Sequence, residues 1–322
     1  MSFHELDLNE LASLTQELMV KSRLIDSSES IELKPHHTVN IRGRTCSHYI
    51  VSCKASNKRF FLKTRKENDT SFHCEAFLRS FALSNGYYPY QITAMPQFDY
   101  KGYQYNLYFF VEGETLEELQ LILSHEEWCQ IANQLRKRID EISSIHAEQY
   151  SDGNEFILDK YDVIQTRKLL PKLRHPAFSD IPSDVIERVQ LNYAAILANS
   201  SFSIPTLLHM DIKPANIVYN RHSGLLSLID FELSRFGDID YGWAQVLLTS
   251  LKPYGDMYKS EIITEITKDR ISLKEAVMIP KFQCYLLYQA ACNLVYYFEK
   301  SVSFPKEMYS LFLKLLAQLQ SF

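Results

Sequence analysis

The segment LLHMDIKPANIVYNRHSGLLSLIDFEL, residues 207–233, constrains this chain more than any other part of the sequence. Two short apolar runs, NIVYN and LLSLIDF, are typical of strands, and the RHSG between them is typical of a turn. A hairpin centred near residue 223 would place Asn216 and Asp230 almost opposite each other. Amide and carboxylate oxygens suit Mg²⁺ when substrate phosphates supply its other ligands. The segment therefore predicts a magnesium site at one end of a hairpin.

Asp211 lies five residues before Asn216, in the loop that leads into this hairpin. A carboxylate beside such a metal site is suited to accept the proton of an attacking hydroxyl. Asp211, Asn216 or Asp230 alone would be interpreted as a loop cap or turn former. Together they form H-x-D-x-x-x-x-N followed by D-F, the order of the catalytic loop and metal-binding turn of protein kinases.

Composition sets the class of protein around this segment. A length of 322 residues allows two lobes with a large core, and a hydrophobic content of 46% is that of a globular protein. The aromatic content of 13% favours an aromatic-rich core over a ring-lined ligand pocket. A net charge of −5 argues against nucleic acid as the main partner, because phosphate binding requires a basic face.

Cysteines and the N-terminal residues indicate the compartment. The six cysteines form no C-x-x-C pair and no zinc-type spacing with histidine. The start, MSFHELDLNELASL, lacks the pattern of a signal peptide, and no apolar run reaches about 18 residues. We therefore expect free thiols, no membrane partner and a cytoplasmic location.

The first third of the chain is typical of a strand-rich lobe. We expect a helix over residues 7–21, strands in SHYIVSC (residues 47–53) and RFFLKT (59–64), a helix over 71–86 and a strand over 105–113. The last of these ends at a glycine, Gly113. Because the pattern then becomes helical, the expected boundary between lobes falls there.

The remainder is typical of a helical lobe. Ser124 and Glu127 form a capping-box pattern, and apolar residues follow at steps of three and four from Trp128 to Ile145. Residues 179–200 and 273–322 also have helical patterns. We therefore predict an α+β chain with an N-terminal lobe over residues 1–112 and a C-terminal lobe over 113–322, which carries the catalytic loop, metal site and acceptor pocket.

At the level of motifs, HMDIKPANIVY and LIDFELSRFGDIDYGWA resemble the catalytic loop and the metal-binding turn of the aminoglycoside phosphotransferase and choline kinase-like family. The resemblance extends from Val39 to the end of the sequence and implies a bilobal protein-kinase-like fold. It implies that Asp211 is the catalytic base and that Asn216 and Asp230 bind Mg²⁺. Lys213 stands where protein Ser/Thr kinases have the lysine that contacts the transferred phosphate.

The same resemblance gives roles to residues of the N-terminal lobe. Lys63, in FFLKT, would bind the nucleotide phosphates, and Glu75, twelve residues later, would hold Lys63. The segment IRGRTCSHYIV takes the place of the phosphate-covering loop. It has one glycine, Gly43, so backbone N–H groups and the hydroxyl of Ser47 would contact the phosphates.

The segment LYFFVEG resembles the interlobe hinge of the family. The resemblance implies that the backbone of Phe109 and Val111 meets the adenine edge. A plain buried strand is the alternative for this stretch, and both interpretations are compatible.

Several residues depart from the family pattern. Met210 replaces the usual glycine of H-G-D, and Glu232 follows Phe231 where protein kinases have glycine. His209 is expected to brace the loop, and Asp240 resembles the acid that anchors it. The activation loop and the A-P-E segment of protein kinases are absent from the sequence, which favours a small-molecule substrate.

The expected activity is transfer of a phosphoryl group from ATP, or from GTP, with Mg²⁺, to a hydroxyl of a small molecule. The acceptor is an aminoglycoside-like antibiotic, an amino alcohol or a sugar. Glu232 and Asp238 are the candidate residues to meet its ammonium groups, and the alternative, which their residue types alone favour, is that they are plain surface or core acids. A resistance role and a metabolic role both stay open, as do a monomer and a homodimer. The alternatives are a choline or ethanolamine kinase, a protein Ser/Thr kinase and a nucleotide-binding pseudokinase.

Overall fold

The computed structural model describes residues 8–41, 44–66, 97–119, 122–146, 168–201, 204–250, 278–301, 303 and 306–322. The chain divides into two compact units. The first unit contains Met1–Gly113 together with Ile229–Glu232, and the second contains Glu114–Leu228 and Leu233–Phe322. The segment Ile229–Glu232 therefore belongs to the unit that is otherwise built from the first third of the sequence.

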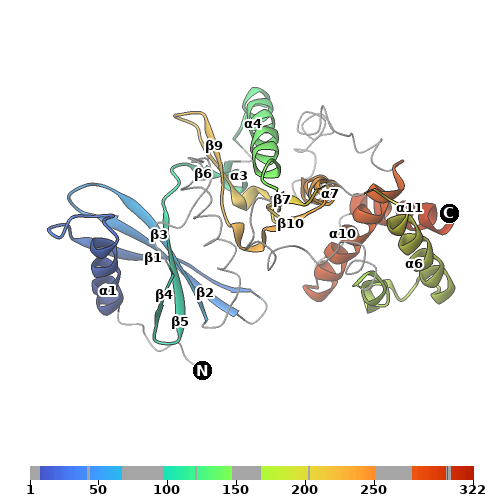
Figure 1. Cartoon of the computed structure of the whole chain (residues 1–322), viewed down its shortest axis with the longest axis horizontal. Coiled ribbons are helices and arrows are strands. Elements are labelled where there is room, and N and C mark those ends of the chain that lie inside the picture. The colour runs from blue at the N-terminus through green and yellow to red at the C-terminus, as the bar shows by residue number, and fades with distance from the viewer. Residues whose placement is uncertain are drawn as a thin grey trace. The chain divides into compact units, whose positions relative to one another are not determined.

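A five-stranded antiparallel sheet with the order β1-β2-β3-β5-β4 forms the body of the first unit (Figure 1). Its strands are β1 Ile31–Ile41, β2 Arg44–Cys53, β3 Arg59–Lys66, β4 Phe98–Tyr100 and β5 Tyr103–Phe109. The central strand β3 lies between β2 and β5, and its Lys63 pairs with His48 on one side and Asn106 on the other. The sheet thus places Lys63 in its middle.

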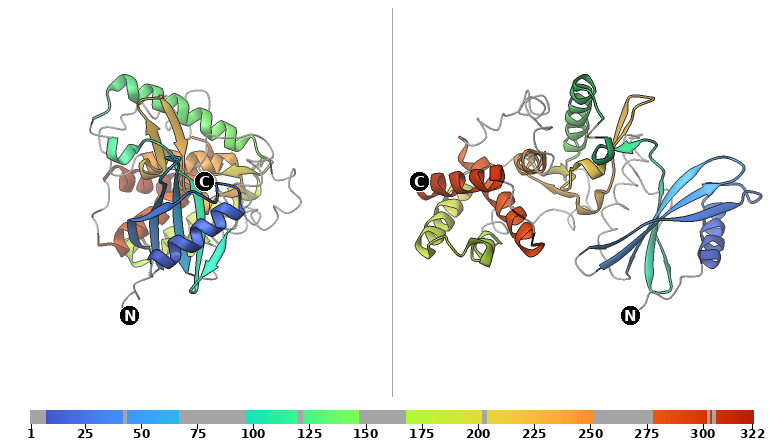
Figure 2. Two further views of the ribbon diagram at one scale, coloured as in Figure 1. Left: turned by 90° about the vertical axis from the view of Figure 1, so that its left-hand side faces the viewer. Right: turned by 180° about the vertical axis from the view of Figure 1, so that it is seen from behind.

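One helix, α1 Leu8–Lys21, covers one face of this sheet (Figure 2). Because side chains alternate along a strand, every second residue of β2, β3 and β5 faces the helix. The buried core of the first unit consists of Leu11, Met19, Ile25, Tyr49, Val51, Cys53, Phe60, Leu62, Tyr105 and Leu107. On β3 the opposite face therefore carries Phe61, Lys63 and Arg65.

The strands differ from expectation at three places. β1 and β4 were not predicted, and β5 ends at Phe109 rather than Gly113. β1 contains Pro35, which has no N–H to donate, and its register shifts between Pro35 and His37. A proline is tolerated there because β1 is the edge of the sheet. The expected helix over 71–86 lies outside the described residues.

The second unit begins with β6 Glu114–Thr115, α3 Leu116–Leu119 and α4 His125–Ser143. The predicted capping box of α4 is confirmed. The Glu127 N–H donates to Ser124 Oγ at 3.2 Å, and the Ser124 N–H donates to Glu127 Oε2 at 2.8 Å. Two backbone donors at the helix start are thus satisfied.

A hairpin of β8 Ile217–Asn220 and β9 Leu225–Leu228 follows in the second unit, as predicted, and β6 pairs with β8 on its other side. Asn220 pairs with Leu225 and Ile217 with Leu228, so the turn lies between Asn220 and Leu225. Asn216 is the residue before β8, and Asp230 comes two residues after β9. A second, two-stranded sheet pairs β7 Thr206–Leu208 with β10 Arg235–Gly237.

The outer edge of β9 is held by α4. Gln134 Nε2 donates to the Gly224 carbonyl at 2.8 Å, and its Oε1 accepts the Leu226 N–H at 3.1 Å. Arg138 Nε adds a bond to the Leu226 carbonyl at 3.4 Å. The side-chain amide of Gln134 therefore pairs with β9 as a neighbouring strand would, and it fixes the hairpin to α4.

The remaining described elements of the second unit are helices. Short 3₁₀ turns lie at η3 Pro176–Phe178, η4 Pro214–Asn216 and η5 Phe231–Leu233, which crosses from one unit to the other. The α-helices are α6 Ser183–Ala198, α7 Ile239–Ser250, α10 Pro280–Glu299 and α11 Lys306–Gln320.

Three of these helices, α6, α10 and α11, pack together (Figure 2). The expected helix over 179–200 is therefore found as α6, and the described part of the tail expected over 273–322 contains two helices, α10 and α11. In the part of the chain that the structure describes, no helix is both long and apolar enough to cross a membrane.

Candidate active site

The candidate catalytic loop, which carries the H-x-D-x-x-x-x-N motif, begins in the second unit at His209, directly after β7. Met210 has φ of 66°, in the left-handed region that costs a residue with a side chain about 1 kcal/mol or more. Glycine, which the family motif has here, adopts this conformation without strain. Gln245 Nε2 of α7 donates to the Met210 carbonyl, and Ser234 Oγ donates to the His209 carbonyl at 3.2 Å. Neutral hydrogen bonds therefore hold the turn in its strained conformation.

His209 braces the same turn from within. Its side chain is buried, and its Nδ1 accepts the N–H of Asp211 at 3.3 Å. The ring therefore fixes the backbone at the residue that carries the candidate base.

Asp211 is brought together with the two other residues that the loop motif predicts. Asn216 Nδ2 donates to both the carbonyl and Oδ2 of Asp211, at 2.9 Å each. Lys213 Nζ lies 2.5 Å from the same Oδ2. The side chain of Asp211 is 20% exposed, so it can be reached from solvent while its orientation is fixed from two sides. With its NH₂ group turned to Asp211, Asn216 presents its amide oxygen as the atom suited to a metal.

In the first unit, Lys63 contacts the two acids of the turn that carries the D-F-E sequence, Asp230 and Glu232. Its Nζ lies 2.6 Å from Asp230 Oδ1 and 2.8 Å from Glu232 Oε2, and its side chain is 9% exposed. Asp230 has φ of 66°, which aspartate adopts more readily than most residues. The structure thus places one buried ammonium group between two carboxylates.

Arg65 is a fourth charged residue of this group, and the sequence analysis missed it. It follows Lys63 by two positions on β3, so it lies on the same face of the strand. Its guanidinium forms an ion pair with Glu232, and its side chain is 8% exposed. Two cations, Lys63 and Arg65, therefore face two acids, Asp230 and Glu232. The spacing of two on a strand was the signal that could have revealed Arg65.

The remaining candidate residues of the first unit are those expected to contact the nucleotide. Ser47 is buried on β2, and its N–H donates to Thr64 Oγ1 at 3.2 Å. Phe109 ends β5 and is 43% exposed, and Val111 follows the strand. Gly43 and Glu75 lie outside the described residues, so the expected pair of Glu75 with Lys63 stays a prediction.

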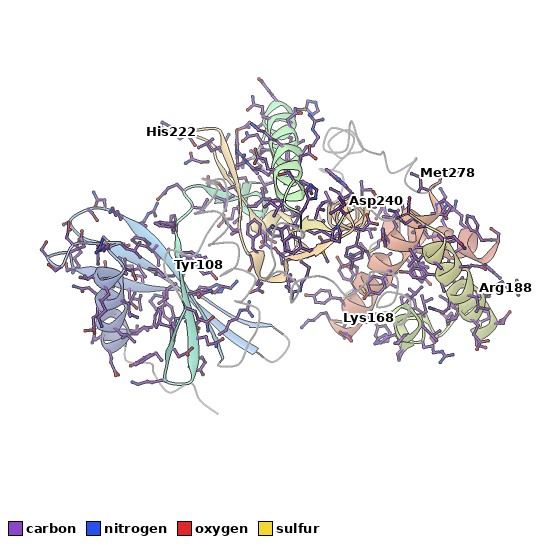
Figure 3. All side chains as sticks on the ribbon, viewed as in Figure 1. Tyr108, Lys168, Arg188, His222, Asp240 and Met278 are labelled. Atoms are coloured by element: carbon purple, nitrogen blue, oxygen red, sulfur yellow. The ribbon has the colours of Figure 1, made fainter. Side chains whose placement is uncertain are left out.

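Asp238 lies in a buried ion-pair group of the second unit. Its Oδ2 accepts hydrogen bonds from Lys281 Nζ at 2.9 Å and from Tyr285 Oη at 3.0 Å. Lys281 also lies 2.7 Å from Asp240, which stands at the beginning of α7 (Figure 3). Burial alone lowers the pKa of the Lys281 ammonium, but its hydrogen bonds to Asp240 and Asp238 outweigh this and raise the pKa.

This group changes the interpretation of two acids. Asp238 is 3% exposed and is engaged by an internal cation, so a contact with a substrate ammonium would have to replace Lys281. Asp240 forms an ion pair with Lys281, and its expected role in anchoring the catalytic loop stays a prediction. Hydrogen bonds to carbonyls of the loop come from Ser234, Gln245 and Asn216.

Comparison with known proteins gives matches in structure but not in sequence. No protein-family model matches the chain, and no curated protein sequence matches it. The gentamicin complex of APH(2'')-IIa is 18% identical, with a TM-score of 0.60 over 100% of this chain and 98% of that one. ADP-bound APH(2'')-Ib is also 18% identical, with a TM-score of 0.60 over 96% of both chains. A thermostable mutant of APH(4)-Ia, in a ternary complex with AMP-PNP and hygromycin B, is 12% identical, with a TM-score of 0.62 over 96% of this chain and 97% of that one.

The chain has the fold of aminoglycoside phosphotransferases. The expected α+β, bilobal protein-kinase-like fold is thereby confirmed. Within this fold, the candidate catalytic loop belongs to the second unit, and the turn with Asp230 belongs to the first.

Proposed function

We propose that this chain is a phosphotransferase that transfers the γ-phosphoryl group of ATP, or of GTP, to a hydroxyl of a small molecule. The observation that carries the proposal is the catalytic loop, in which Asn216 and Lys213 fix the Asp211 carboxylate. A carboxylate oriented in this way, in the H-x-D-x-x-x-x-N pattern of a phosphotransferase fold, is suited to act as a general base.

Asp211 would accept the proton of the acceptor hydroxyl as the hydroxyl oxygen bonds to the γ-phosphorus. The bond from that phosphorus to the β,γ-bridging oxygen breaks, and the nucleoside diphosphate leaves with the electron pair. Lys213, whose side chain is 45% exposed, is long enough to contact the transferred phosphoryl group from the same loop. The loop therefore supplies both the base and a cation.

Lys63 would contact the nucleotide phosphates, with Glu75 as its partner on the following helix. The amide oxygen of Asn216 and the carboxylate of Asp230 are hard oxygen donors, which fits Mg²⁺. Bound Mg²⁺ would neutralise charge on the phosphates. Gly43 and Ser47 would contact the phosphates, and the backbone of Phe109 and Val111 would contact the base.

For the acceptor we propose an aminoglycoside-like antibiotic, or another amino alcohol or amino sugar, in the cytoplasm. Gentamicin and hygromycin B are bound to neighbours of the same fold, which supports this class. Glu232 and Asp238 are the acids proposed to meet ammonium groups. An ammonium group would have to displace Lys63 or Arg65 from Glu232, and Lys281 from Asp238. A protein Ser/Thr kinase is the second candidate, and the D-I-K-P-A-N loop is the observation that favours it.

The test is a nucleotide-consumption assay with the full chain, ATP or GTP, and Mg²⁺. The acceptors are gentamicin, hygromycin B, choline, ethanolamine, sugars and a panel of proteins. With the acceptor that supports turnover, Asp211→Asn should lower kcat by about 10²-fold or more, because it removes the general base. Nucleotide binding, measured by calorimetry, should change little.

Asp180→Asn is the matched control, because Asp180 is exposed and follows η3, away from the catalytic loop in sequence. Turnover with proteins and with no small molecule would refute the small-molecule acceptor and favour the second candidate, a protein Ser/Thr kinase. Normal turnover in Asp211→Asn would refute the assignment of the base. Nucleotide binding without turnover on any acceptor would leave a pseudokinase.

A further inference from the structure

The charged group on β3 and the metal-binding turn contains a residue for which the proposed function gives no role. Lys63 Nζ contacts Asp230 at 2.6 Å and Glu232 at 2.8 Å, while Arg65 forms a second ion pair with Glu232. The side chains of Lys63, Arg65 and Glu232 are 9%, 8% and 14% exposed. Three of the four charges are therefore largely shielded from water, where each needs a partner of opposite sign.

Binding of a nucleotide would redistribute these contacts. In the proposed reaction, the Lys63 ammonium contacts the phosphates and Asp230 contacts Mg²⁺. Glu232 would then lose the ammonium as a partner while staying largely buried. A buried carboxylate that loses a cation is destabilised, so Glu232 competes with the phosphates for Lys63.

We propose that Arg65 is a positioning residue for nucleotide binding: it neutralises Glu232, so that Lys63 can leave Glu232 for the phosphates. This inference rests on the proposed function. Arg65 holds the carboxylate that would otherwise retain the lysine, and in this role it acts through Glu232 and not on the substrate. The pairing explains why an acid at position 232, where protein kinases have glycine, is compatible with a nucleotide site.

A direct contact of Arg65 with the phosphates would be a different role. In that case, removal of Arg65 would weaken binding whether or not Glu232 is charged. In the proposed role, removal of the Glu232 charge makes Arg65 dispensable. A double-mutant cycle on these two residues therefore separates the two roles.

The experiment measures the dissociation constant of the full chain for AMP-PNP and for GMP-PNP, each with Mg²⁺, by isothermal titration calorimetry. Arg65→Met should raise Kd by about tenfold or more, because Lys63 stays with Glu232. Arg65→Met combined with Glu232→Gln should return Kd to within about threefold of the unmodified chain. Arg65→Lys keeps the positive charge and should bind within the same range.

Lys101→Met is the control, because it removes an ion pair with Glu10 at an exposed site of the same unit. Its Kd should not change. Thermal unfolding of each variant checks that the chain is folded. If Arg65→Met unfolds, the Kd of the double variant, in which Glu232 carries no charge, provides the readout.

Each other outcome rejects the proposal in its own way. An unchanged Kd in Arg65→Met, with normal binding by the unmodified chain, would overturn the role of Arg65. A double variant as weak as Arg65→Met would show that Arg65 itself binds the phosphates, which also overturns the proposal. If the unmodified chain binds neither nucleotide, the proposed function fails and this inference fails with it.

Discussion

Opposite charges hold the candidate residues of the first unit together, whereas hydrogen bonds from uncharged groups hold the backbone of the catalytic loop in the second. Lys63 and Arg65 pair with Asp230 and Glu232 through their charged side chains. The carbonyls of the loop instead accept hydrogen bonds from an amide and a hydroxyl, and an imidazole holds its N–H.

The two kinds of contact differ in how they respond to a ligand. Coulombic attraction depends weakly on angle, so an ammonium group can exchange a carboxylate for a phosphate with little change in geometry. A hydrogen bond weakens steeply when its angle is lost, so it fixes an orientation. Lys63, which would exchange partners, is thus held by ion pairs. The backbone around Asp211, which would position the base, is held by hydrogen bonds that depend on direction.

The largest effect is expected when a charged residue of the first unit is replaced. Lys63→Met removes one of two largely buried cations that face two acids, and it should lower the free energy of unfolding by about 2 kcal/mol. Urea denaturation measures this value. Lys101→Met, at an exposed pair, should change it by less than about 0.5 kcal/mol. Equal losses in both variants would mean that burial does not strengthen the Lys63 pairs.

The next largest effect is expected when a hydrogen bond to the loop backbone is removed. Gln245→Met removes the donor to the Met210 carbonyl and should lower kcat about tenfold, with little change in the KM for nucleotide, because Asp211 is less well oriented. Met210→Gly in the same chain should restore much of the loss, since glycine adopts positive φ without a restraint.

Steady-state kinetics and hydrogen exchange of residues 207–216 report on this loop, with Gln130→Met, at an exposed position of α4, as the control. An absence of rescue by Met210→Gly would show that Gln245 does not act through the left-handed turn.

A smaller effect is expected at the hairpin of β8 and β9. Gln134→Met removes the amide that pairs with Gly224, in the turn, and with Leu226 of β9, and it should cost about 1 kcal/mol. The difference in urea midpoint from the control Gln130→Met measures it. No difference between the two variants would mean that water replaces the amide without loss.

The smallest effect at neutral pH should come from Glu29, a carboxylate far from either group in sequence. The N–H of Ala55, and then that of Ser56, donate to it, and these hydrogen bonds lower its pKa from the ordinary value of 4.5. A lowered pKa in the folded state contributes stability above the unfolded pKa, and this is lost as the pH falls. Glu29→Gln should therefore flatten the decline of stability below about pH 4.5, as measured by urea midpoints across the acid range. A decline identical to that of the unmodified chain would contradict this account.

Short-range patterns in the sequence predicted much of the fold and part of the site. The capping box at Ser124 and the hairpin before Asp230 were found because their signals span a few residues. Asp211, Lys213 and Asn216 contact each other because a five-residue spacing in one loop determines their neighbourhood.

Contacts between residues distant in sequence were not predictable in this way. Gln245 reaches the Met210 carbonyl over 35 positions, and Arg65 reaches Glu232 from another part of the chain. Strand β1 was missed because Pro35 and the histidines after it are unusual in strands. Its formation depends on pairing with β2, which a local pattern does not contain.

Pro35 has a consequence for association of the chain with itself. β1 is the edge of the five-stranded sheet, and an edge strand with regular N–H and C=O groups can pair with a strand of another molecule. The missing N–H of Pro35 and the register shift beside it interrupt that row of groups. Continuation of the sheet from one molecule into the next through β1 is therefore disfavoured, and a homodimer of this chain would need a different surface.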